Sequence, residues 1–265
     1  GHVERIVPGG AGLVRGPKGV VLVDHSAQGD RLQIEIESVR SGATRGSIVS
    51  ILEPGPGRAE PPCPWYGRCG GCDFQHLTYA AQIEAKRRIV LDAFVRIGGI
   101  EYPDEIVVHP APRPFGSRAR IELHADQDAH EVGFHERRSR RIVPIEHCMV
   151  SRDELNSALG SIRRSRQPYP AAIHLLGGNG EVRVDPAFPP LQGGSFWLRV
   201  GAFDYLVDPG SFFQSSLDLL PELIETVIGS SPEGGALVWD LYCGGGLFSL
   251  PLGKRFVQVM GVDFD

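Results

Sequence analysis

The most constraining feature of the 265-residue chain is a short segment that carries three of its five cysteines. It reads P-P-C-P-W-Y-G-R-C-G-G-C-D-F-Q-H-L, so Cys63, Cys69 and Cys72 follow the spacing C-x5-C-x2-C. The surrounding prolines and glycines predict a tight loop in which several thiolates converge on one point. Three soft ligands in one loop indicate a metal or cluster site that needs a fourth ligand. A four-cysteine iron–sulfur cluster would take that ligand from Cys148 or Cys243.

Two other uses of these cysteines stay open at this point. Disulfides would leave an odd thiol in the segment, and the composition does not indicate a secreted scaffold. A structural zinc ion is the closer rival, because His76 and His147 lie near enough in the sequence to be ligands. Zinc sites usually combine two C-x2-C pairs or cysteine with histidine, and this segment has a single C-x2-C. The pattern therefore favours the cluster.

Composition and charge narrow the class of protein. With 42% hydrophobic and 22% charged residues, the chain is typical of a globular protein with two or three domains. No stretch reaches the roughly 18–20 apolar residues of a membrane helix, so we expect a cytoplasmic protein without a membrane partner. The net charge of −5 argues weakly against a protein coated by nucleic acid. Seven arginines nevertheless lie within thirty residues in mid-chain and would give a basic face. The alternative is that the R-R-S-R-R run is a solvated turn. The seven are Arg113, Arg118, Arg120, Arg137, Arg138, Arg140 and Arg141.

The hydrophobic pattern predicts alternating β and α segments. Short apolar alternations in the first fifty-odd residues, separated by glycine, proline and aspartate, predict a compact five-stranded β-barrel. Helices are expected over residues 79–97, ended by Gly98 and Gly99, and over 155–162. Strands are expected within 117–145, 171–184 and 195–207. Cys148 follows a predicted strand, from which a sheet could present it to the cysteine segment.

The end of the chain carries a second informative pattern. An apolar strand over 238–242 runs into Cys243-Gly244-Gly245-Gly246 and then an apolar helix start, which is the opening of a doubly wound nucleotide-binding fold. A second strand over 257–262 ends at Asp263, where a carboxylate is placed to bind both hydroxyls of a ribose. A nicotinamide dinucleotide fits this pattern loosely. The single short glycine loop favours S-adenosylmethionine, which carries no pyrophosphate.

Together these segments resemble the TRAM-domain, iron–sulfur RNA uracil-5-methyltransferases, which make 5-methyluridine in ribosomal and transfer RNA. The cysteine segment resembles the family's cluster loop, and I-V-P-I-E-H-C-M resembles the segment with the fourth ligand. D-P-G-S-F-F-Q-S-S resembles the opening of the methyltransferase domain, and D-L-Y-C-G-G-G-L-F-S-L-P-L with G-V-D resembles its cofactor loop and ribose contact. The resemblance implies an α/β multidomain protein. Its parts would be an OB-like TRAM β-barrel over 1–56, a central α+β domain with the cluster over 57–208, and the start of a Rossmann-like methyltransferase domain over 209–265.

The resemblance also implies roles for individual residues. The ligands of a 4Fe–4S cluster would be Cys63, Cys69, Cys72 and Cys148. The cofactor and target-base pocket would contain Gln214, Tyr242, Gly244, Gly246 and Asp263, with Phe212 packing nearby towards the RNA. RNA phosphates would contact Arg137, Arg138, Arg140 and Arg141. Ser216 and Leu247 depart from the asparagine and the side-chain amide usual in the family, which leaves those cofactor contacts to backbone amides.

The reaction implied by the family is methylation of C5 of a uracil flipped out of the RNA, after a cysteine thiolate adds to C6. Only two strands of the methyltransferase sheet precede Asp265, so we expect the nucleophilic cysteine and the general base beyond it and the chain alone to be inactive. The predicted function is S-adenosylmethionine-dependent methylation of a uridine in 23S rRNA, more than in tRNA, by a monomer. The alternatives are a non-catalytic RNA-binding protein with a structural cluster and an iron–sulfur oxidoreductase that uses a dinucleotide.

Overall fold

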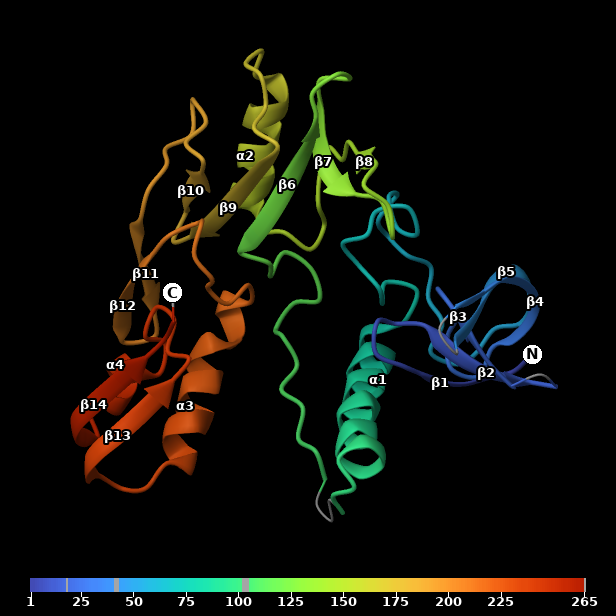
Figure 1. Ribbon diagram of the computed structural model, residues 1–265, viewed down its shortest axis with the longest axis horizontal. Coiled ribbons are helices and arrows are strands. Elements are labelled where there is room, and N and C mark those ends of the chain that lie inside the picture. The colour runs from blue at the N-terminus through green and yellow to red at the C-terminus, as the bar shows by residue number, and fades with distance from the viewer. Residues whose placement is uncertain (18, 41–42, 102–104, 265) are drawn as a thin grey trace. The chain divides into compact units, whose positions relative to one another are not determined.

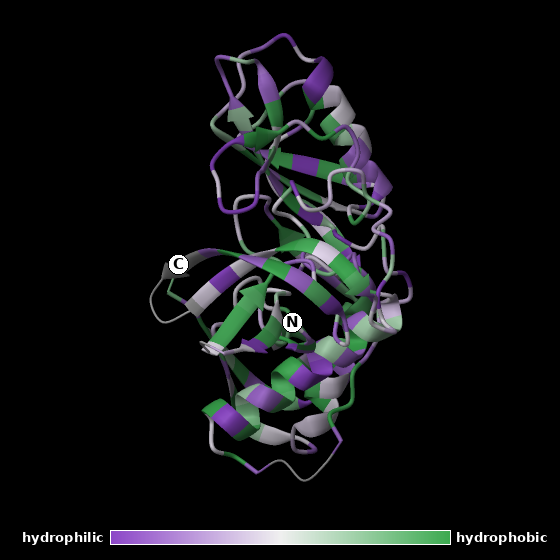
Figure 2. Ribbon diagram, turned by 90° about the vertical axis from the view of Figure 1, so that its right-hand side faces the viewer, coloured by the Kyte–Doolittle hydropathy of each residue, from purple (hydrophilic) through white to green (hydrophobic). Residues whose placement is uncertain are grey.

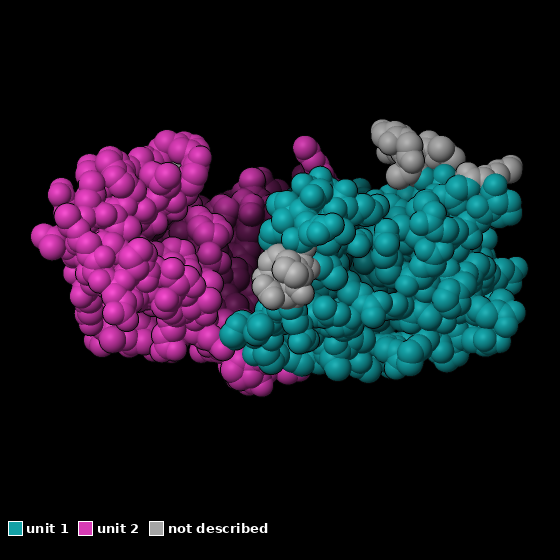
Figure 3. Space-filling view, turned by 90° about the horizontal axis from the view of Figure 1, so that it is seen from below, with its two compact units in different colours: residues 1–110, 135–139 teal, residues 111–134, 140–265 magenta. Residues whose placement is uncertain are grey.

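The computed structural model describes residues 1–17, 19–40, 43–101 and 105–264 (Figure 1). The chain forms two compact units, one of residues 1–110 with 135–139 and one of residues 111–134 with 140–265 (Figure 3). Several separate sheets and the helices between them make a mixed α/β fold, as the sequence predicts. None of the helices formed by the described residues has both the length and the apolar character needed to cross a bilayer.

The first unit contains a five-stranded sheet in the order β1-β2-β3-β5-β4. All neighbours are antiparallel except β3 and β5, which are parallel. Its strands are β1 (Val3–Ile6), β2 (Gly12–Gly16), β3 (Gly19–Val23), β4 (Arg31–Arg40) and β5 (Ala43–Glu53).

The number of strands agrees with the sequence prediction, but the prediction of a closed barrel is wrong. Where β1 and β4 approach each other, the described residues form an isolated bridge between His2 and Arg31, flanked by backbone hydrogen bonds that join Gly1 to Leu32 and Val3 to Asp30. Strand β1 has four residues and β4 has ten, and the contact at the start of β4 does not extend into a strand pair, so the sheet stays open.

Helix α1 (Tyr79–Asp92) covers the core of this sheet through Ala85, with Ala81 and Ile89 partly buried beside it. The Thr78 hydroxyl caps its first turn by accepting a hydrogen bond from the Ala81 N–H. The helix continues as a π-helical turn, η1 (Ala93–Ile97), before Gly98 and Gly99 end it, and this confirms the predicted helix over 79–97.

The second unit contains a five-stranded sheet in the order β10-β9-β6-β7-β8. Helix α2 (Asp153–Arg164) packs on β9 and β10 and buries its apolar residues, while acidic residues occupy its first turn and basic residues its last. The helices accordingly show hydrophilic and hydrophobic residues side by side along their length (Figure 2). The strands are β6 (Arg120–Asp126), β7 (Glu131–His135), β8 (Ile142–Val143), β9 (Ala172–Gly178) and β10 (Glu181–Asp185).

Two predicted strand regions are hairpins. Strands β9 and β10 are joined by Asn179 and Gly180, which both have positive φ as a two-residue hairpin turn requires. Strands β11 (Phe196–Val200) and β12 (Phe203–Val207) form the second hairpin.

After this hairpin the chain forms η2 (Leu217–Leu219), α3 (Leu220–Ser230), β13 (Gly235–Leu241), α4 (Ser249–Leu252) and β14 (Phe256–Val262). Strands β13 and β14 are parallel, in register from Gly235 and Phe256 to Leu241 and Val262. The strand–loop–helix–strand prediction is therefore confirmed. The sequence analysis did not predict α3, which has a proline at its start and buries Leu220 and Ile224.

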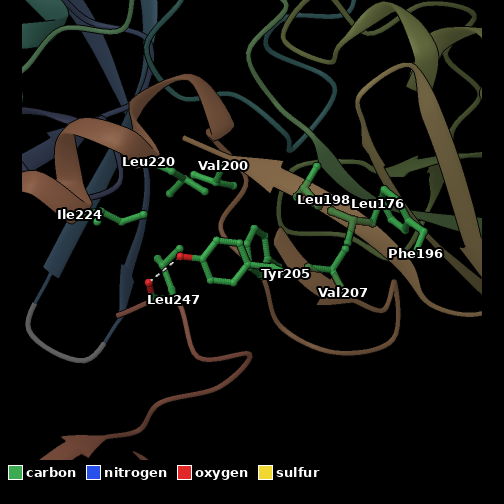
Figure 4. Packing of buried hydrophobic residues seen from close by; sticks show 10 residues of the cluster. Leu176, Phe196, Leu198, Val200, Tyr205, Val207, Leu220, Ile224 and Leu247 are labelled. Atoms are coloured by element: carbon green, nitrogen blue, oxygen red, sulfur yellow. Dashed lines mark hydrogen bonds between the residues drawn. The ribbon is translucent and has the colours of Figure 1, made fainter. Parts of the chain in front are cut away.

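A hydrophobic core joins the β11–β12 hairpin to α3 and to the end of the glycine loop (Figure 4). At its centre the Tyr205 hydroxyl donates a hydrogen bond of 2.9 Å to the Leu247 carbonyl. Because Tyr205 is buried, this bond ties the loop that follows β13 to a rigid part of the unit. The cluster consists of Leu176, Phe196, Leu198, Val200, Tyr205, Val207, Phe213, Leu220, Ile224 and Leu247.

Candidate cofactor site and the cysteine segment

The glycine loop between β13 and α4 has an unusual backbone. Tyr242, Gly244 and Gly246 all have positive φ, at 61°, 48° and 77°. Glycine adopts this conformation freely, but a tyrosine rarely does. The Tyr242 and Cys243 N–H groups both donate to the carbonyl of Val262, at 2.7 and 3.3 Å. The start of the loop is thus fixed to the end of β14, and the Tyr242 side chain is 78% exposed.

The structure brings Gly244 and Asp263 together, as the sequence predicts. Asp263 follows β14, and its Oδ2 accepts a hydrogen bond of 2.7 Å from the Gly244 N–H. Its Oδ1 accepts a second one from the Phe264 N–H at 2.8 Å. Each carboxylate oxygen has two lone pairs, so both oxygens can accept a further hydrogen bond from a hydroxyl. A carboxylate held at the carboxyl ends of two parallel strands is suited to a ribose.

Asp240 is a residue of this site that the sequence analysis missed. It is nearly buried near the end of β13, and its Oδ2 accepts a hydrogen bond of 2.5 Å from the hydroxyl of Ser249. Since Ser249 begins α4, this bond connects the two elements that flank the glycine loop. An acidic residue inside the apolar run V-W-D-L-Y was the available signal.

The segment D-P-G-S-F-F-Q-S-S lies beside the loop. Phe213 is buried against Tyr205, with ring centroids 5.9 Å apart, and a Cβ built on Gly245 would lie 3.9 Å from its ring. Gln214 comes next and is half-buried, whereas Phe212 is 73% exposed. The segment is held on β6, because the Arg120 guanidinium donates to the carbonyls of Ser211 and Pro209.

The cysteine segment supplies thiols that suit a metal or cluster, but the described residues do not form a metal site. Cys63, Cys69 and Cys72 are half-buried, and so is Cys148. All five cysteines lie in the described part of the chain, and none of them forms a disulfide there. The Gly71 N–H donates a hydrogen bond of 3.4 Å to Cys69 Sγ. Among the described residues, however, no three histidine, cysteine or acidic side chains are grouped to hold a metal ion, so the expected convergence is not seen.

Arg137 and Arg138, which are predicted to contact RNA, are engaged in ion pairs. Arg137 pairs with Asp73 and, at 3.4 Å, with Asp24, and Arg138 pairs with Asp24 at 2.6 Å. Exposed positions are occupied by Arg140 and Arg141.

Parallel β13 and β14, a glycine loop between them and a carboxylate at their carboxyl ends form a strand–loop–helix–strand arrangement of the kind found in nucleotide-binding folds. No protein-family model matches the chain. The 23S rRNA (uracil(1939)-C(5))-methyltransferase RlmD of Vibrio parahaemolyticus is 27% identical to it, over 99% of this chain and 69% of the relative. An uncharacterized RNA methyltransferase of Streptomyces coelicolor is 31% identical, over 96% of this chain and 65% of the relative.

Among solved structures, the tRNA (uracil-54, C5)-methyltransferase of Pyrococcus abyssi in complex with S-adenosyl-L-homocysteine shares the fold. Its TM-score is 0.68 at 25% identity, over 96% of this chain and 70% of that chain. The homologues of this protein are therefore RlmD-type 23S rRNA uracil-C5 methyltransferases and related RNA methyltransferases. The resemblance seen in the motifs is confirmed at this level, while its TRAM and iron–sulfur parts stay predictions.

Proposed function

We propose that this protein functions in the transfer of a methyl group from S-adenosylmethionine to C5 of one uridine in RNA, with 23S rRNA as the substrate. The RlmD-type relatives support the substrate and the reaction. The hydrogen bond between Gly244 and Asp263 carries the assignment of the cofactor, because it fixes a ribose-type acceptor beside a glycine at which a built Cβ would have no neighbour within 4 Å.

In this proposal each residue of the loop has a distinct part. The Asp263 carboxylate accepts the ribose hydroxyls, and Gly244 and Gly246 let the backbone approach the cofactor. The exposed Tyr242 ring and Gln214 border the cofactor and target base, and the exposed ring of Phe212 stacks on RNA. The bound cofactor supplies an electrophilic methyl group. The proposal assigns neither the nucleophilic cysteine nor the general base to a residue of this chain.

We also propose Cys63, Cys69, Cys72 and Cys148 as the ligands of a 4Fe–4S cluster. Their thiol chemistry suits iron, and the Gly71 N–H beside Cys69 is the kind of hydrogen bond that tunes cluster sulfurs. Zinc is the alternative for the same donors. Anaerobic purification followed by assays of iron, acid-labile sulfide and zinc distinguishes the two, because iron and sulfide in equal amounts support the cluster and zinc without sulfide contradicts it.

The division into an RNA-binding unit over 1–56, a central domain over 57–208 and a methyltransferase part over 209–265 is likewise proposed. It is supported by the end of β5 at Glu53 and of β12 at Val207. Arg140 and Arg141 are the proposed phosphate contacts of the central domain. With RNA as its substrate, the protein is proposed to act as a cytoplasmic monomer.

Calorimetric titration of the chain with S-adenosylhomocysteine tests the cofactor assignment directly. Saturable binding supports the methyltransferase, and RNA binding without any cofactor binding would favour the non-catalytic RNA-binding protein. Methyl transfer from labelled cofactor to 23S rRNA or to tRNA, measured with an enzyme as long as the relatives, then tests the choice of substrate.

A further inference from the structure

The first unit contains a pocket of about 490 Å³. Its lining residues are distant in the sequence from the glycine loop. Its volume falls within the roughly 300–1,000 Å³ of ligand pockets in general. Aromatic and proline side chains form much of its wall, and the lining residues include His25, Tyr66, His76, Pro54 and Pro61. The proposed methyltransferase chemistry uses none of these residues.

His25 has the features of a residue held in place for a ligand. Its φ of +57° is rare outside glycine, and the Arg58 guanidinium fixes this backbone by donating a 2.9 Å hydrogen bond to the His25 carbonyl. Its Nε2 is buried, yet it has no hydrogen-bond partner within the described residues. Buried polar atoms are nearly always paired, so this ring nitrogen is an exception that the described residues do not account for.

Tyr66 and His76 make the rest of this wall rigid. His76 is 1% exposed, and its Nε2 donates to the Ser26 carbonyl at 3.0 Å. Its Nδ1 is then the acceptor for the Tyr66 hydroxyl, at 2.6 Å. The Tyr66 ring meets the His25 ring edge to face, with centroids 5.1 Å apart. Two aromatic rings are therefore fixed before any ligand arrives.

The charge next to His25 favours an anion. Arg45, Arg137 and Arg138 all approach the single carboxylate of Asp24, at 3.6, 3.4 and 2.6 Å. With the Arg137–Asp73 pair counted, three guanidinium groups meet two carboxylates in the cluster next to His25, while Glu60 adds one carboxylate to the lining of the pocket. RNA phosphates are drawn to such clusters of guanidinium groups.

We propose that this pocket binds one unpaired nucleobase of the RNA substrate, with the adjoining phosphate at Arg45 and Arg138. A base presents flat faces to the aromatic rings and prolines, as in sequence-tolerant recognition of single strands by stacking. The inference rests on RNA being the substrate, as proposed above. It adds a second anchoring point for the RNA, separate in sequence from the target-uridine site.

The variant that tests this is His25→Gly, because glycine keeps the left-handed backbone and removes the ring. Asn179→Gly is the matched control, since Asn179 also has a positive φ, of 55°, in the exposed β9–β10 turn. Each protein is titrated with a short single-stranded RNA and with the same RNA carrying one abasic position, and its melting curve verifies folding. The expected result is roughly 5- to 100-fold weaker RNA binding by the His25 variant, with the control unchanged.

The abasic RNA separates the base from the phosphate. Wild-type protein should lose affinity for the abasic strand, and the His25 variant should bind both strands equally. Equal binding by wild type and variant would overturn the pocket proposal. S-adenosylhomocysteine titrations of the same samples keep the two proposals apart: intact cofactor binding with unchanged RNA binding rejects the pocket alone, and loss of cofactor binding in wild type rejects the proposed function.

Photo-crosslinking provides an independent readout. RNA substituted with 4-thiouridine is irradiated with the protein, and the adduct is located by mass spectrometry. An adduct on the peptide with His25 or Tyr66 supports the pocket, and adducts found only elsewhere contradict it.

Discussion

The backbone N–H of Gly244 donates a 2.7 Å hydrogen bond to the carboxylate of Asp263, nineteen residues further along the chain. This bond joins the glycine loop to the end of the neighbouring parallel strand before any cofactor is present. It therefore fixes the direction in which the carboxylate offers its remaining lone pairs to a ribose.

Asp263→Asn tests that role. The amide oxygen can still accept from Gly244, but the NH₂ group that replaces the second oxygen cannot accept a ribose hydroxyl. A hydrogen bond to a charged group contributes about 1.5–3 kcal/mol, so S-adenosylhomocysteine should bind roughly 10- to 100-fold more weakly by calorimetry. Asp204→Asn, which removes an exposed carboxylate paired with Arg199 in the same unit, should change nothing. Equal losses in both variants would contradict a specific ribose contact.

Ser249→Ala tests the connection between β13 and α4. Removing the hydroxyl leaves the nearly buried Asp240 carboxylate without the donor at 2.5 Å. An unmet buried acceptor costs about 1–3 kcal/mol, and the free energy of unfolding in denaturant should fall by that amount. Ser230→Ala removes an exposed hydroxyl that bonds to the Thr226 carbonyl and is the control, with little expected change. Similar values for the two variants would mean that the Asp240–Ser249 bond does not stabilise the loop.

The parts of the fold that follow from the sequence are those with local signals. The strand, glycine loop, helix and second strand around Gly244 follow one another directly, and Gly98 and Gly99 mark where the first long helix ends. Closure of the first sheet was predicted wrongly because it depends on pairing between β1 and β4, which are distant in the sequence and unequal in length.

Contacts between side chains that are distant in the sequence could not be predicted from the sequence. His25, Arg58 and Tyr66 each belong to a different segment, and the pocket wall exists only after the sheet has brought those segments together. Likewise, the bond from Ser249 to Asp240 depends on the path of the loop between them. Helix α3 did carry a local signal, since Pro221 stands at a helix start, where proline is favoured.

Stability should depend on pH through His76. Burial lowers the pKa of His76 from 6.5 to about 4, although the hydrogen bond to the Ser26 carbonyl partly opposes this shift. The unfolded chain therefore takes up this proton at a higher pH than the folded protein does. The resulting stability is complete above pH 6.5 and is lost as the pH falls from there to about 4, with a slope of at most about 1.4 kcal/mol per pH unit.

His76→Gln should flatten this dependence. The free energy of unfolding is measured in denaturant at several pH values across the window, and the slopes are compared, because the substitution also changes stability at neutral pH. Burial lowers the pKa of His25 as well, so a residual slope of the same sign should remain. His2→Gln, which removes an exposed histidine, is the control. An unaltered slope in the His76 variant would show that its protonation does not limit stability in acid.

Replacing the five cysteines one at a time distinguishes the proposed 4Fe–4S cluster from the alternative uses of these residues. If Cys63, Cys69, Cys72 and Cys148 hold a 4Fe–4S cluster, replacing any of them by serine should greatly reduce the iron and acid-labile sulfide of anaerobically purified protein. Cys243 is the internal control. It lies in the glycine loop, where a Cβ built on Gly261 would approach its Sγ to 3.0 Å, and it is not a proposed cluster ligand. Cys243→Ser should therefore keep iron and sulfide at the wild-type amount. Loss in the Cys243 variant with retention in Cys148→Ser would make Cys243 the fourth ligand. A structural zinc site would be indicated by zinc in place of iron, if that zinc is lost both when a cysteine of the segment is replaced and when His76 or His147 is replaced.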